Sequence, residues 1–117
     1  MKKMMILLLA AMLLTACGKA ADKNREAVYE NITAKEAKQI MDTEGGYVIL
    51  DVRTQEEYDQ GHIPGAILIP DTEIEIRAED VLTDKTQLIL VYCRSGRRSK
   101  LAAEALTELG YTNIKEF

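Results

Sequence analysis

The sequence predicts an α/β domain with a central, mostly parallel sheet and helices on both of its faces. Continuous apolar runs at residues 47–52, 66–69 and 88–92 are typical of strands in a sheet that is covered on both sides. Stretches with helix-capping patterns or helical apolar spacing separate these runs. Strands that alternate with helices in this way indicate parallel connections within one sheet.

The first residues of the chain are typical of an export signal. Lys2 and Lys3 precede an apolar run at residues 4–14, which is shorter than the about 20 residues that a membrane span needs. Basic residues followed by a short apolar run are the pattern of a secretory signal peptide. An ordinary signal peptide and an uncleaved anchor remain alternatives, and both would still export the protein.

The apolar run ends in a Leu-Thr-Ala-Cys motif at Cys17, which resembles the lipobox of bacterial lipoproteins. That resemblance implies a signal peptide at residues 1–16 and acyl chains such as palmitate on Cys17, which becomes the new N-terminus. We therefore expect a lipid anchor in the cell membrane, facing the periplasm or the cell surface. A polar tether would follow at residues 17–30, although the Ala, Lys and Glu content of 20–30 would also allow a helix.

The folded domain is expected over residues 31–117 and begins with a short strand around Ile32. Thr33 and Glu36 form a capping-box pattern, which predicts a helix that ends at Gly45-Gly46. Residues 47–52 then form a strand.

Thr54 and Glu57 repeat the capping-box pattern and predict a short helix over residues 54–60. Gly61 suits a left-handed residue after that helix. The strand at 66–69 stops at Pro70, and the acidic stretch 71–80 is compatible with a helix or an irregular turn.

The last part of the domain contains the strand at 88–92, a helix at 99–109 and a short strand at 112–115. Apolar residues at helical spacing predict the helix. The sequence contains no internal repeat or low-complexity block.

Charge and cysteine content exclude several functional classes. The chain has a formal net charge of −4, and loss of Lys2 and Lys3 with the leader makes it about −6. An acidic chain argues against nucleic acid as a partner. Only two cysteines are present, so lipidation of Cys17 leaves Cys93 without a disulfide partner. One histidine and one remaining cysteine give no metal-binding spacing, and no P-loop or dinucleotide motif occurs, so no cofactor is expected.

The most informative segment is Cys93 and the loop that follows it. Cys93 ends an apolar strand, and ligands bind outside the carboxyl ends of strands in such sheets. Main-chain N–H groups at the start of the next helix favour negative charge and would hold the thiol as a thiolate. Arg94, Arg97 and Arg98 add positive charge. A buried structural cysteine has no need of these arginines.

Three residues outside this loop have competing interpretations. Arg53 could contact an anion, but an ion pair with a neighbouring acid (Glu56, Glu57 or Asp59) is the favoured interpretation. Asp51 is expected to brace the loops. His62 precedes a strand and is expected at the opposite rim from Cys93, in a structural role.

Two motifs resemble those of the rhodanese-like family. The first covers residues 50–66, with Leu-Asp-Val-Arg, Glu-Glu-Tyr and Gly-His-Ile-Pro-Gly-Ala, and the second is Cys-Arg-Ser-Gly-Arg-Arg-Ser at 93–99. They occur in the family's order and at its usual separation, and the resemblance covers residues 31–117. Family members generally continue past the position of Phe117 through a glycine-rich turn and a helix. The sequence leaves open whether a partner, the membrane or further chain covers the sheet there.

The resemblance implies sulfurtransferase activity. Cys93 would attack a sulfane sulfur donor such as thiosulfate and carry the sulfur as a persulfide, which a thiol acceptor or cyanide then removes. The substrate-binding cradle would consist of Arg94, Ser95, Gly96, Arg97, Arg98 and Ser99. No partner beyond the small sulfur-containing anion, the thiol and the membrane is implied.

The residue types suit that chemistry, because sulfur transfer needs a thiolate and stabilisation of an anionic persulfide. Gly96 allows the loop to turn its amides inward. Arg98 can bind a sulfonate oxygen through its planar guanidinium. Ser99 can donate to the thiolate or cap the helix, and Arg94 and Arg97 can contact substrate or remain solvated.

Two other activities stay open. A sulfur-carrier or sulfide-sensing module would use the same Cys93 persulfide without rapid turnover. Cysteine-dependent phosphatases and arsenate reductases have five residues between cysteine and arginine, whereas only four separate Cys93 from Arg98. The shorter loop favours a single sulfur over a tetrahedral phosphate.

Overall fold

All five strands of the sheet run parallel, in the order β1-β5-β4-β2-β3. They are β1 (Glu30–Asn31), β2 (Tyr47–Asp51), β3 (Ile67–Leu68), β4 (Leu88–Tyr92) and β5 (Ile114–Glu116). The computed structural model of the protein describes residues 28–117. The predicted signal peptide at 1–16, Cys17 and most of the predicted tether lie outside the described residues.

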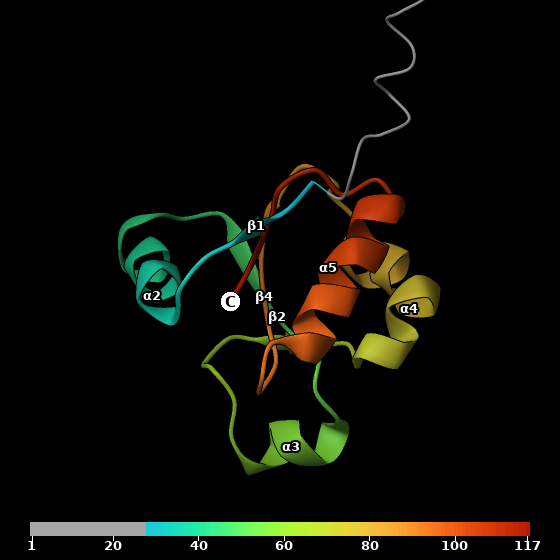
Figure 1. Cartoon of the computed structure of the whole chain (residues 1–117), viewed down its shortest axis with the longest axis horizontal. Helices are drawn as coiled ribbons and strands as arrows, with labels where there is room; N and C mark the ends of the chain where they lie inside the picture. The colour runs from blue at the N-terminus through green and yellow to red at the C-terminus, as the bar shows by residue number, and fades with distance from the viewer. Residues whose placement is uncertain (1–27) are drawn as a thin grey trace, which may run out of the picture.

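Helices cover both faces of the sheet, which confirms the predicted fold class. They are α2 (Ala34–Thr43), α3 (Gln55–Gln60), the 3-10 turn η1 (Asp71–Glu73), α4 (Ile74–Val81) and α5 (Arg97–Glu108). Figure 1 shows α2 on one face and α4 with α5 on the other, while α3 lies beyond the lower end of the strands. No helix within residues 28–117 is long and apolar enough to cross a membrane.

Two apolar clusters, one on each face, hold the helices against the sheet. The larger lies under α4 and α5 and includes Leu50, Ile89, Val91 and Leu106, all fully buried. The smaller contains Ile49 and Leu90, with Ile40 and Met41 of α2 packed against it. Because neighbours in β2 and β4 alternate between the clusters, both strands are buried on both faces, as their continuous apolar sequences predict.

Both predicted capping boxes are present. Thr33 accepts a hydrogen bond from the Glu36 N–H at 3.0 Å, and the Glu36 carboxylate accepts one from the Thr33 N–H at 2.9 Å. Thr54 and Glu57 form the same reciprocal pair at the start of α3. Such a cap is worth about 1 kcal/mol.

Several boundaries differ from the sequence prediction. β1 is formed by Glu30–Asn31, before Ile32, so the sheet begins one residue inside the predicted tether. The stretch 71–80 is η1 followed by α4, and α5 begins at Arg97, two residues earlier than predicted. Gly61 has φ 155° and ψ 139°, which is not the predicted left-handed helical conformation although it still favours glycine.

Candidate active site

Cys93 lies at the carboxyl edge of the sheet, where ligands bind in parallel α/β folds. It follows β4, the central strand, whose neighbours are β5 and β2. The thiol is half-buried. The sequence therefore predicts its location correctly.

The loop after Cys93 folds its main chain around the sulfur. Gly96 has φ 93° and ψ −16°, the left-handed conformation that glycine adopts without strain. Its N–H donates to the Cys93 Sγ at 3.1 Å, and the Ser99 N–H donates to the same sulfur at 3.3 Å. The turn and the first residues of α5 thus direct two main-chain donors at one atom.

These donors make the thiol more acidic. Partial burial alone would raise the pKa of Cys93, but a hydrogen bond with the Ser99 hydroxyl and hydrogen bonds from the Ser99, Gly96 and Ser95 N–H groups outweigh it. The pKa of Cys93 therefore lies below its ordinary value. The largest lowering contributions come from the loop and the start of α5, as the sequence predicts for the main chain.

Arg98 is not a free anion-binding group in this structure. Its guanidinium forms two hydrogen bonds with Glu57, at 2.9 and 3.1 Å. The pKa of Glu57 is lowered to about 2, first by this pairing and then by the Thr54 N–H. An anion that binds to Arg98 must therefore share the guanidinium with Glu57.

The role of Glu57 at the site was not predicted, because the sequence pattern indicates only a helix cap and one candidate partner for Arg53. Glu57 and Arg98 are 41 residues apart, and no local pattern links them.

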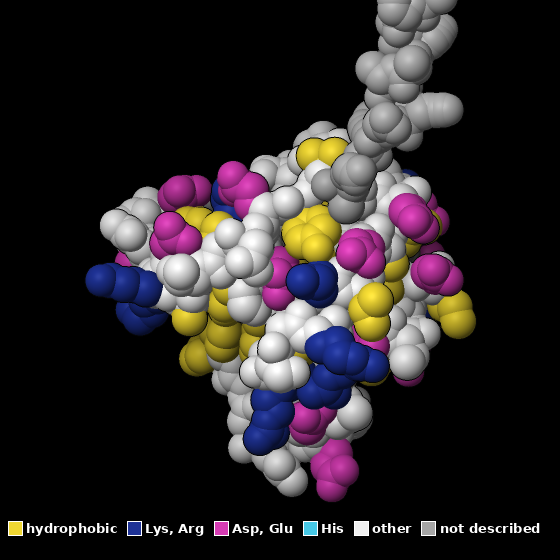
Figure 2. Space-filling view, in the orientation of Figure 1, with side chains coloured by type: hydrophobic (Ala, Val, Ile, Leu, Met, Phe, Trp, Pro, Cys, Tyr) yellow, Lys and Arg dark blue, Asp and Glu magenta, His cyan; other side chains and the backbone are white. Residues whose placement is uncertain are grey.

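The remaining arginines of the loop are exposed. Arg94 Nη1 lies 3.9 Å from the Glu57 carboxylate, and its side chain is 68% exposed. Figure 2 shows basic side chains gathered over the N-terminal end of α5. Arg97 and Ser95 line an open pocket of about 720 Å³ beside the loop, with Lys100 and Leu101 of α5. Positive charge is thus gathered beside the loop that follows Cys93.

Arg53 pairs with Asp51, which corrects the predicted pairing with Glu56, Glu57 or Asp59. Arg53 Nη2 lies 2.7 Å from the Asp51 carboxylate and also donates to the Gly61 carbonyl. The Tyr92 hydroxyl donates to Asp51 at 2.6 Å. Asp51 is fully buried and braces the loops, as predicted.

His62 lies at the same edge as Cys93, so its predicted place at the opposite rim is wrong. The residue before it, Gly61, contacts Arg53, and the residue after it, Ile63, donates its N–H to the Tyr92 hydroxyl. The chain does not return to the amino edge because β3 has only two residues and pairs with the end of β2.

The His62 ring stacks on Tyr58 with centroids 3.6 Å apart, and its Nδ1 lies 2.8 Å from the Tyr58 carbonyl. These contacts fit the structural role predicted for it.

Glu116 is a second residue of the site that was not predicted from the sequence. Its carboxylate accepts a hydrogen bond from the Ser99 hydroxyl at 2.6 Å and one from the Asn31 amide at 2.6 Å. The residue is only 2% exposed. The signal was alternation in β5, because Ile114 is buried and Glu116, two residues later, must face the same side.

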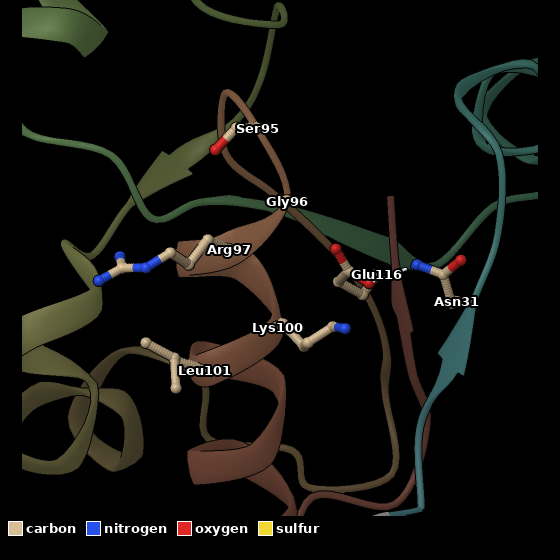
Figure 3. Close-up of a pocket in the computed structure, with 7 residues that line it drawn as sticks. All are labelled: Asn31, Ser95, Gly96, Arg97, Lys100, Leu101 and Glu116. Carbon is tan, nitrogen blue, oxygen red and sulfur yellow. Dashed lines mark hydrogen bonds between the residues drawn. The ribbon is translucent and has the colours of Figure 1, made fainter.

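Figure 3 shows the open pocket beside the loop, which Glu116 also lines. Glu116 from β5 and Asn31 from β1 lie on one side, joined by their hydrogen bond, and the Lys100 side chain extends from α5 towards them. Arg97 and Leu101 point the other way. Within residues 28–117, no three His, Cys, Asp or Glu side chains converge as a metal site would require.

Known proteins are similar to this chain in both sequence and fold. The family model of the rhodanese-like domain matches residues 33–117. The chain is 44% identical over 66 residues to the thiosulfate sulfurtransferase PspE of Escherichia coli, covering 56% of this chain and 64% of the relative. It is 36% identical over 97 residues to the putative sulfur carrier protein YrkF of Bacillus subtilis, covering 83% of this chain and 51% of the relative.

A solved structure described as a rhodanese with anions from E. coli is 41% identical and has a TM-score of 0.57, over 60% of this chain and 82% of that one. The chain spans about half to two thirds of the length of the two curated relatives. With the family model matched over most of the chain, and with the fold and the loop around Cys93 as described, this protein belongs to the rhodanese-like domain family.

Proposed function

We propose that this protein is a sulfurtransferase that moves a sulfane sulfur from an anionic donor such as thiosulfate to a thiol or cyanide, through a persulfide on Cys93. The observation that carries the proposal is the pair of main-chain N–H groups, from Gly96 and Ser99, that point at the Cys93 sulfur. The name of one relative, a thiosulfate sulfurtransferase, supports the choice of donor.

The reaction has two displacement steps. In the first, the Cys93 thiolate attacks the outer sulfur of thiosulfate, a sulfur–sulfur bond forms, and sulfite leaves with the electron pair of the bond that breaks. In the second, the acceptor thiolate or cyanide attacks the outer sulfur of the persulfide, and Cys93 leaves as the thiolate. No oxidant or reductant is consumed.

The loop assists both steps by electrostatics. Donors that stabilise the thiolate also lie where the negative charge of the persulfide develops, so they need no rearrangement during the reaction. The exposed arginines attract an anionic donor to the opening.

A thiosulfate:cyanide assay tests the proposal. We expect thiocyanate formation by the parent protein and none by Cys93→Ser, since a hydroxyl at this position is not ionised at neutral pH. Equal rates for the two proteins would refute a Cys93 persulfide. Turnover of p-nitrophenyl phosphate in place of thiosulfate would instead favour a phosphatase, which the pairing of Arg98 with Glu57 disfavours.

A second candidate is a sulfur carrier that holds the persulfide without rapid turnover, favoured by the similarity to a putative sulfur carrier protein. Intact-mass measurement separates the two. A gain of 32 Da by the protein that persists in the presence of cyanide and thiols supports the carrier. Rapid loss of that added mass supports the enzyme.

We also propose that the enzyme is exported and held in the cell membrane by lipid on Cys17. The support is the sequence alone, namely the apolar run that ends in the Leu-Thr-Ala-Cys motif. Fractionation of cells tests this: the parent protein should sediment with membranes, and Cys17→Ala should not. Equal membrane fractions would refute lipid attachment at Cys17.

A further inference from the structure

Glu116 is a buried carboxylate that the proposed sulfur transfer leaves without a role. The residue is 2% exposed, and within residues 28–117 its carboxylate accepts hydrogen bonds only from neutral groups, the Ser99 hydroxyl and the Asn31 amide. Among the described residues, no cation lies within ion-pair distance of it. Burying a carboxylate without a cationic partner is costly, so its presence beside the active-site loop calls for an explanation.

Ser99 links Glu116 to the reactive sulfur. The Ser99 Oγ lies 2.6 Å from Glu116 Oε2, 3.2 Å from the Gly96 carbonyl and 3.5 Å from the Cys93 Sγ. A serine hydroxyl has one proton to donate. With the thiol protonated, the sulfur donates to Ser99 Oγ and Ser99 donates to Glu116, so each group has a partner.

Ionisation of Cys93 disturbs this arrangement. A thiolate can only accept, so Ser99 must either turn its proton to the sulfur and leave Glu116 Oε2 without it, or stay with Glu116 and leave the sulfur one donor short. The two negative charges would also lie at most about 6 Å apart through the Ser99 oxygen. Both effects oppose the thiolate.

We propose that Glu116 is a positioning residue for Cys93, which holds the Ser99 hydroxyl away from the sulfur and so opposes loss of the thiol proton. The main-chain donors of the loop make the thiol acidic, and Glu116 limits how acidic it becomes. Because nucleophilicity falls as the pKa of a thiol falls, this limit keeps the thiolate reactive towards its donor. The consequence for sulfur transfer rests on the proposed function, but the effect on the thiol does not.

Other charged groups around Glu116 belong to the elements packed against it. Lys100 and Arg97 of α5 line the same pocket (Figure 3). Tyr29, just before β1, has its pKa raised by burial and by the charges of Glu104 and Glu116. Among the described residues, no hydrogen bond joins the side chains of these groups to the Ser99 hydroxyl, so the short hydrogen-bonded path from Glu116 to the sulfur runs through the serine.

The experiment is a titration of Cys93 in Glu116→Gln, which keeps the shape and an oxygen acceptor but removes the charge. The pH dependence of iodoacetamide alkylation, followed by the mass of the peptide that carries Cys93, gives the thiol pKa in the full chain. We expect the pKa to fall by about one unit. Glu104→Gln, which removes the same charge from an exposed position of α5, should leave it unchanged.

Ser99→Ala tests the path. This variant removes a donor and should raise the pKa of Cys93, and Glu116→Gln added to it should then produce a smaller fall than in the parent. If Glu116→Gln does not fold, Glu116→Asp carries the test, because its shorter side chain keeps the charge but withdraws from Ser99 and should lower the pKa by less.

A Cys93 pKa in Glu116→Gln that equals or exceeds that in Glu104→Gln would overturn the proposal. Sulfur loading gives an independent readout. At a pH where Cys93 is fully ionised in both proteins, Glu116→Gln should react with thiosulfate about threefold more slowly than the parent. If neither protein loads sulfur, the proposed function fails while the alkylation result still stands.

Discussion

Two buried carboxylates flank the central strand of this sheet, and they are stabilised in opposite ways. Asp51 ends β2, Glu116 ends β5, and each of these strands pairs with β4. Asp51 is neutralised by Arg53 at 2.7 Å and bound by the Tyr92 hydroxyl. Among residues 28–117, the Glu116 carboxylate is bound only by the hydroxyl of Ser99 and the amide of Asn31.

The difference separates structural support from control of the thiol. The charge of Asp51 is compensated locally, and its hydrogen bonds hold the turn after β2 against the end of β4. No cation in the described part of the chain compensates the charge of Glu116, and one of its two hydrogen-bond partners, Ser99, is shared with Cys93. We expect changes at Asp51 to alter stability and changes at Glu116 to alter the reactive sulfur.

The largest expected effect is on stability, in Asp51→Asn. The substitution leaves the Arg53 side chain, which is only 14% exposed, without its counter-charge. Breaking such a pair should reduce the free energy of unfolding by about 3 kcal/mol. Urea denaturation at pH 7 measures this, and a loss below about 1 kcal/mol would show that Asp51 is not the main support of this edge.

Acid should remove the same stabilisation gradually. Burial alone would raise the pKa of Asp51, but hydrogen bonds from Arg53 and Tyr92 lower it overall. A carboxylate with a lowered folded-state pKa contributes its full stability above its unfolded value of about 3.9, and loses it as the pH falls through the folded value. The difference in unfolding free energy between the parent and Asp51→Asn should therefore be constant from about pH 7 to 5 and smaller by about 1 kcal/mol at pH 3. A difference unchanged at pH 3 would contradict this.

Tyr92→Phe should have an intermediate effect. The hydroxyl donates to Asp51 and accepts from the Ile63 N–H, so its loss leaves the buried Asp51 carboxylate and the partly buried Ile63 N–H short of one partner each. We expect a loss of about 1–2 kcal/mol in the free energy of unfolding, measured by urea denaturation. Because the Asp51–Arg53 pair remains, an effect as large as that of Asp51→Asn would mean that the hydroxyl, not the guanidinium, holds the carboxylate.

Glu116→Gln should change stability least. Its partners are neutral, and the amide oxygen of glutamine can still accept a hydrogen bond, so we expect the free energy of unfolding to change by no more than about 1 kcal/mol. The same variant should alter the titration of Cys93, which Asp51→Asn should not. A loss near 3 kcal/mol with no change in the thiol would reverse the assignment of the two carboxylates.

Local patterns predicted most of the elements, because each pattern is satisfied within a few residues. The Thr33 and Thr54 caps and the strand before Cys93 depend on neighbours in sequence, and all were found as predicted. The conformation of Gly96 also follows from its place between strand and helix.

The partners of charged groups were not predictable in the same way. The pairing of Arg98 with Glu57 joins residues 41 apart, and that of Asn31 with Glu116 joins residues 85 apart. The position of His62 depended on the length of β3, which the apolar run at 66–69 overstated. Such features depend on how the strands come together, which no local pattern records.

The uniform direction of the strands determines how the molecule presents its thiol. The described chain begins at Val28, beside the start of β5, whereas Cys93 follows the end of β4 (Figure 1). Val28 and Cys93 therefore lie at opposite edges of the sheet. Anything joined to the domain through the residues that precede Val28 would enter at the edge that does not carry the thiol.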